Sequence, residues 1–124
     1  MTVGWVASAT RGRDLVSRLV GAETAQQLAS TGWEETRRAL EATVYGLELP
    51  ADADRMATRR AAAEATAWQL RVLAGWLPPG KGSLARLFAA PFEIANIESH
   101  RAHLDGNPTP PPISLGALSV SWPR

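Results

Sequence analysis

The sequence predicts an all-α fold, a small bundle of about five helices around one long central helix. Alanine is abundant and β-branched residues are sparse, so local propensity favours helix through most of the chain. Apolar residues recur at helical spacing in several segments, and glycine and proline divide these segments from one another. With 124 residues and 13.3 kDa, the chain has room for one small core.

The first helix is expected over residues 5–20, where small and apolar residues follow a three- and four-residue spacing. Its predicted packing face contains Val6, Ala9, Gly12, Val16 and Leu19. The charged side chains between them are expected to face solvent. Gly21 supplies a typical C-terminal stop.

Two short helices are predicted next, over residues 23–30 and 33–42, with Thr31-Gly32 between them. Helices of this length need tertiary packing to be stable. Residues 44–50 contain a glycine and a proline and show no helical period, which predicts an ordered loop anchored by Tyr45.

The strongest periodicity predicts a long central helix over residues 52–77. Its stripe consists of Ala57, Ala61, Ala65, Trp68, Val72 and Trp76. Trp68 and Trp76 are therefore predicted to be core residues or to lie in seams between helices. The sequence Pro78-Pro79-Gly80 ends this helix, because proline cannot continue the helical hydrogen bonding.

The last helical stretch covers residues 83–104, and Pro91 predicts a break within it. We expect a helical domain over residues 1–106, a proline-rich spacer over 107–112 and an apolar strip over 113–124. The strip is too short to bury itself. It is expected to dock on this domain, on another copy, or on further sequence, where it would be the start of another unit.

Charge and composition exclude several classes of function. The formal charge of +1 gives no electrostatic argument for nucleic-acid binding, and the absence of cysteine excludes disulfides and thiolate sites. No apolar run is long enough to cross a bilayer, and the N-terminus lacks the pattern of a secretory signal. These observations predict a cytoplasmic protein without direct membrane insertion.

Two segments look like functional motifs but are better explained as ordinary structure. Residues 75–82 match G-x-x-x-x-G-K, yet Gly82 replaces the required hydroxyl residue and a helix precedes the segment, so a turn between helices is expected. His100 and His103 lie near Glu98 without a third firm ligand, which favours solvated side chains over a metal site. No nucleophile, acid or base converges, so neither an enzyme nor a cofactor is expected.

The segment at residues 92–98, Phe-Glu-Ile-Ala-Asn-Ile-Glu, is the least easily explained. Asn96 lies between apolar residues, where it is expected to cap or bridge backbone groups freed by Pro91 or to contact a ligand. Trp122, close to the end of the chain, is the best candidate among the tryptophans for an interface.

Three segments together resemble the C/d subunit family of V-type and A-type rotary ATPases, in particular its actinobacterial members. They are residues 7–13, Ala-Ser-Ala-Thr-Arg-Gly-Arg; residues 40–46, which read L-x-x-T-x-Y-G; and residues 92–98 with their Asn-Ile pair. The resemblance covers residues 5–104. Family members are several-fold longer and contain three related helical units, so this chain corresponds to about one unit.

The resemblance implies a non-catalytic adaptor between the rotor stalk and the membrane ring, on the cytoplasmic face. Partners would be stalk or ring subunits, with self-association through residues 113–124 as a further hypothesis. The candidate interaction positions are Tyr45, Gly46, Trp76, Phe92, Glu93, Asn96 and Trp122. The alternative is a free-standing helical module that binds another protein.

Overall fold

The computed structural model describes residues 3–119 and, within them, only helices and their connections, so the all-α prediction is confirmed. The α-helices are α1 (Val3–Ser17), α2 (Ala22–Ala29), α3 (Trp33–Glu41), α4 (Arg55–Trp76) and α5 (Gly82–Leu104). Two 3-10 helices, η1 (Val44–Glu48) and η2 (Gly116–Leu118), complete the described part of the chain.

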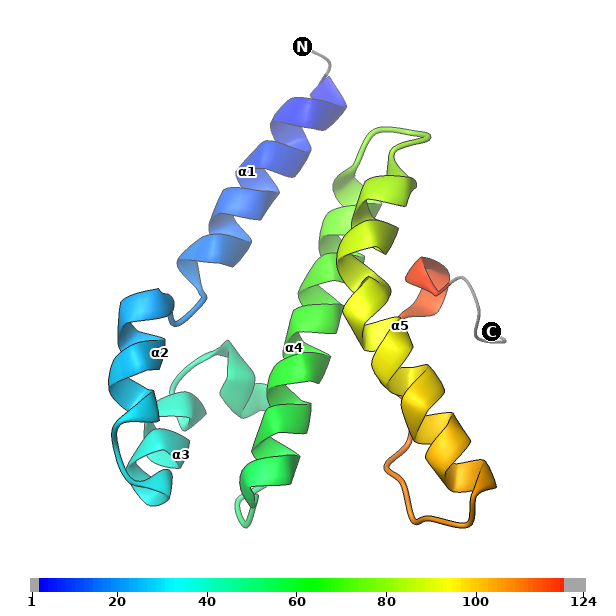
Figure 1. Ribbon diagram of the computed structural model, residues 1–124. Helices are drawn as coiled ribbons and strands as arrows, with labels where there is room; N and C mark the ends of the chain where they lie inside the picture. Colours follow the sequence, from blue (N-terminus) through cyan, green and yellow to red (C-terminus); the bar gives the residue numbers. More distant parts are fainter. Residues whose placement is uncertain (1–2, 120–124) are drawn as a thin grey trace.

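The long helix α4 is central, as the periodicity predicted, and lies between α1 and α5 (Figure 1). It begins after Asp54, whose carboxylate accepts a hydrogen bond of 2.8 Å from the backbone N–H of Ala57. Such a cap satisfies one of the N–H groups that have no partner within the helix. The helix ends at Trp76, two residues before the first proline.

Helix α1 packs on α4 through a face that agrees only in part with the predicted one. Gly12, Val16 and Leu19 of that prediction line a cavity beside α4. Ser8 and Leu15 are buried, whereas Val6 and Val16 are exposed. Gly12 is part of the true contact, since a Cβ at this position would lie 3.9 Å from a leucine methyl of α4. The Ser8 hydroxyl donates to a carbonyl of its own helix, so its burial leaves no donor unsatisfied. Ser8 and Gly12 let the two backbones approach closely, and Leu15 supplies the large buried side chain of α1.

Trp68 and Trp76 were predicted to lie in the core or in seams between helices, and the core alternative is wrong. Trp68 and Trp76 are exposed, and the buried residues of the helix include Ala61, Ala65 and Ala67. Alanine allows α1 and α5 to approach α4 from both sides, which leaves no space for an indole ring between the helices. The rings consequently lie at the edges of the contacts.

The two short helices form as predicted, and they depend on neighbours for support. The Thr36 hydroxyl of α3 donates to the Leu28 carbonyl of α2 at 3.0 Å, which links the pair. Neither helix contains a buried residue. The following segment, predicted to be a loop, forms η1 and packs between α3 and α4.

Helix α5 continues through Pro91, so the predicted break is wrong. The helix instead changes direction about halfway along its length, and its second half diverges from α4 (Figure 1). Proline removes the hydrogen bond to the carbonyl of Leu87. Both Pro91 and Leu87 are exposed, so water can satisfy that carbonyl and the helix persists with a bend.

The segment after α5 returns along the bundle and places η2 against α4 and α5. Leu115 and Leu118 are buried there, in one cluster with Ala67, Ala85 and Ala89. Of the places open to the apolar strip, its described part therefore docks on its own chain. Trp122 lies outside the described residues.

Candidate interaction site

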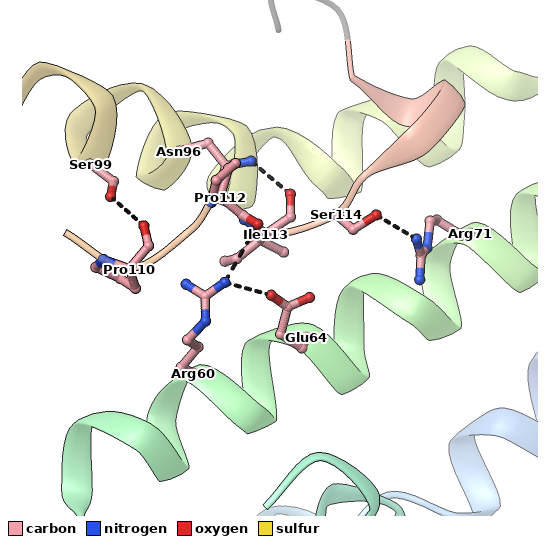
Figure 2. A network of polar contacts seen from close by, with 9 residues as sticks. All are labelled: Arg60, Glu64, Arg71, Asn96, Ser99, Pro110, Pro112, Ile113 and Ser114. Carbon is pink, nitrogen blue, oxygen red and sulfur yellow. Dashed lines mark hydrogen bonds and ion pairs between the residues drawn. The ribbon is translucent and has the colours of Figure 1, made fainter. Parts of the chain in front are cut away.

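Asn96 fixes the returning segment with two hydrogen bonds to one residue (Figure 2). Its side-chain nitrogen donates to the Ile113 carbonyl at 2.9 Å, and its side-chain oxygen accepts from the Ile113 N–H at 2.7 Å. Asn96 is buried. The expectation that this side chain bridges backbone groups is correct. These groups belong to the returning segment, however, and not to the helical turn that loses a hydrogen bond at Pro91.

Two arginines of α4 hold the other side of the returning segment (Figure 2). Arg60 donates to Glu64 at 2.8 Å and to the Pro112 carbonyl at 3.5 Å. Arg71 donates to the Ser114 hydroxyl at 2.8 Å. Residues 112–114 are thus held between α4 and α5 by polar contacts from both helices.

A groove of about 720 Å³ lies where the second half of α5 diverges from α4. Its walls include Met56 and Ala63 of α4 and Pro91, Phe92 and Ala95 of α5. The returning segment closes one side of it. Because its walls are mainly apolar, the groove is suited to burying apolar side chains of another molecule.

The predicted site residues on α5 only partly converge. Phe92 lines the groove and also packs against the alanine and leucine core. Asn96 reaches the groove from the same helix. Glu93 instead accepts a hydrogen bond of 3.0 Å from the Ser119 hydroxyl, beyond η2. Its role in the described structure is to hold the chain after η2.

The remaining predicted site residues lie elsewhere. Tyr45 and Gly46 belong to η1, on the other side of α4 from α5 (Figure 1). Trp76 is exposed at the end of α4, and Trp122 is outside the described residues. The seven positions therefore do not form one site.

Tyr45 and Gly46 have clear structural reasons for their identity. Tyr45 lines a cavity of about 400 Å³ between the short helices and α4, and burial raises the pKa of its hydroxyl. A Cβ on Gly46 would lie 2.8 Å from the carbonyl carbon of Glu41 and closer still to its oxygen. Only glycine fits there without displacing the end of α3.

The two motif-like segments are ordinary structure in the described chain. Residues 75–82 contain the end of α4 and the turn into α5, as predicted, with Gly80 in the left-handed conformation at φ +79°. His100 and His103 line a small cavity of about 220 Å³ beside the prolines. Within residues 3–119, no three metal-ligating side chains lie close enough to hold an ion.

Neither arginine that holds the returning segment was predicted as a site residue from the sequence. Arg60 and Glu64 are four residues apart on one helix, a spacing that predicts an ion pair. The contacts of Arg60 with Pro112 and of Arg71 with Ser114 join residues far apart in sequence. No pattern among neighbouring residues predicts contacts between residues so far apart in sequence.

Many large hydrophobic side chains of the described chain are exposed. The buried apolar residues are six alanines and three leucines. By contrast, fourteen large hydrophobic side chains are exposed, among them Met56 at 70% and Leu104 at 72%. Single exposed apolar residues are normal, whereas larger contiguous apolar patches are typical of interaction surfaces.

Comparison of the chain with protein-family models, with curated proteins and with solved structures finds no match. Among residues 3–119, no helix combines the length and the apolar character needed to cross a membrane. Residues 3–119 form a helical bundle with an apolar groove, and the relation of the chain to the rotary ATPase subunits stays a prediction.

Proposed function

We propose that this chain is a non-catalytic helical adaptor that binds other proteins, and that its partners are stalk or ring subunits of a rotary ATPase. One observation supports the adaptor function above all: among the described residues, fourteen large hydrophobic side chains are exposed around a core made mainly of alanines. The resemblance to C/d subunits supports the choice of partner and a position on the cytoplasmic face of the membrane.

The groove between α4 and α5 is the proposed contact with that partner. It is lined by Met56, Pro91 and Phe92, so it would bury the apolar face of a partner helix. Arg59 lies at its edge, is exposed, and makes no ion pair among the described residues. Acidic side chains beside the apolar face of the partner helix would match this arginine.

Capture of partners from the native cell tests the proposal. The tagged chain is expected to retain stalk or ring subunits, and Met56→Glu is expected to lose them because it places a charge in the groove. Leu104→Glu is the matched control, since Leu104 is equally exposed and does not line the groove. Retention of these subunits by Met56→Glu would remove the groove from the proposal.

The alternative is a free-standing interaction module with a different partner. It is favoured by the docking of Leu115 and Leu118 within the same chain, which gives this single unit a core of its own. The same capture experiment separates the two functions. Proteins that depend on Met56 but include no rotary ATPase subunit would support the module.

A further inference from the structure

One face of α5 carries a row of exposed apolar side chains at spacings of three or four residues. The row consists of Leu84, Leu87, Phe88, Pro91 and Ile94, and its four large members other than the proline are 44% to 70% exposed. We call it the α5 row. The opposite face, with Ala85 and Ala89, packs against the core.

An apolar row of this extent is unusual on the surface of an isolated domain. Contiguous exposed apolar patches above a few hundred Å² mark interaction surfaces. Within residues 3–119, the elements next to α5, which are α4 and η2, contact its other face. The row is therefore open to a partner.

Opposite charges stand at the two ends of the row. Lys81 precedes Leu84 by three residues and Glu98 follows Ile94 by four, so both continue the same face. Both side chains are exposed, and neither makes an ion pair within the described part of the chain. Two copies of such a surface are complementary in charge when they lie antiparallel, because the basic end of each copy then faces the acidic end of the other.

We propose that the α5 row binds a second copy of this chain in an antiparallel, two-fold symmetric pair. With the two-fold axis between Phe88 and Pro91, Phe88 of one copy faces Pro91 of the other across the interface. Lys81 of each copy then lies opposite Glu98 of the other, so the symmetry makes the ion pair twice. A parallel pair would instead place equal charges together at both ends.

This inference goes beyond the proposed adaptor function, because it names a different partner, and the α5 row shares only Pro91 with the groove. It also differs from self-association through residues 113–124, since Leu115 and Leu118 are already buried within their own chain. The purified 124-residue chain is sufficient to test it, so its failure is separate from a failure to capture rotary ATPase subunits.

Sedimentation equilibrium of the full chain over a range of concentrations measures the association directly. The unmodified chain is expected to be dimeric at the highest concentrations and Leu87→Glu monomeric, because the charge would be buried at the centre of the interface. Leu104→Glu is the control on the same helix, at 72% exposure and outside the row. Circular dichroism checks that both variants keep their helix content.

Charge reversal then tests the antiparallel arrangement. Lys81→Glu and Glu98→Lys are each expected to weaken dimerisation about tenfold, because each turns two ion pairs into repulsions. An equimolar mixture of these two variants is expected to form a heterodimer, in which both pairs are again opposite in charge. A fold defect in either variant would not be repaired by mixing.

Three results would overturn the proposal. The first is a chain that stays monomeric at every concentration. The second is a dimer that Leu87→Glu leaves intact, which would place the contact elsewhere, including the end of the chain near Trp122. The third is a mixture of the two charge variants that associates no better than either variant alone.

Discussion

Asn96 shows how a single side chain can replace a secondary-structure partner. The returning segment forms no regular structure before η2, so the backbone N–H and carbonyl of Ile113 have no neighbouring strand or helix to pair with. The amide of Asn96 carries one donor and one acceptor and satisfies both groups. An apolar residue of similar size could fill the space but not supply these bonds.

Replacing Asn96 with alanine is therefore expected to lower the free energy of unfolding by about 2–3 kcal/mol, since two partly buried backbone groups lose their partners. Urea denaturation followed by circular dichroism measures this. Ser99→Ala is the control, because its bond to the Pro110 carbonyl is long, at 3.5 Å, and exposed. Equal losses in the two variants would show that the Asn96 bonds contribute nothing specific.

Gly46 and Gly75 give opposite predictions for the same substitution. Gly46→Ala is expected to cost about 1–3 kcal/mol, because the new methyl group meets the Glu41 carbonyl. Gly75 is in α4 with nothing within 4 Å of a Cβ, so Gly75→Ala is expected to add about 0.5–1 kcal/mol. Thermal unfolding of both variants checks the signs, and a stabilised Gly46→Ala would contradict the proposed close contact.

For single residues, the sequence indicated which side chains were unusual, but not which residues they contact. Asn96 stood out between apolar residues, and its role as a bridge to backbone groups was predicted. Its partner, Ile113, is seventeen residues away and is reached only because the chain reverses after α5. The contact of Arg71 with Ser114 spans 43 residues and was not predicted for the same reason.

Among the elements, helices were predicted well and their packing faces poorly. The ranges expected for the two short helices agree with α2 and α3 to within one residue at each end. Helix formation depends on neighbours in sequence, such as the capping Asp54. The buried face depends on what lies opposite, and next to α4 small residues such as Ser8 and Gly12 fit where the valines of α1 do not.

The prediction at Pro91 was also limited by tertiary surroundings that neighbours in sequence do not reveal. Its chemistry correctly implies a lost hydrogen bond in α5, but whether the helix ends there depends on access of water to the freed carbonyl. The exposure of Pro91 and Leu87 provides that access. The bend also has a consequence for the site, since the divergence of α5 from α4 opens the apolar groove.

The short helix η2 is expected to contribute much of the stability of the bundle. Leu118→Ala removes a buried side chain from the central cluster and is expected to cost about 2–4 kcal/mol. Leu104→Ala, at an exposed position, is expected to change stability by less than about 0.5 kcal/mol. Chemical denaturation compares the two. Similar values would mean that η2 is not docked in solution.

For the whole molecule, the main consequence of the alanine-rich sequence is a thin core. Described side chains that are buried and apolar are small except for Leu15, Leu115 and Leu118. Helices packed through alanine approach closely and bury little apolar area for each residue. Many of the larger apolar side chains are left on the surface, among them Met56 of the groove and the leucines of the α5 row.

The sequence by itself determined the helices, the turns between them and the centrality of α4, because these follow from propensity, spacing and capping among residues close in the chain. Only the tertiary structure decided which faces are buried, because burial depends on residues brought together from distant positions. Trp68 and Trp76 fit the apolar stripe of α4 but not the narrow space beside its alanines. The same close packing brings Leu118 inside and leaves the α5 row outside.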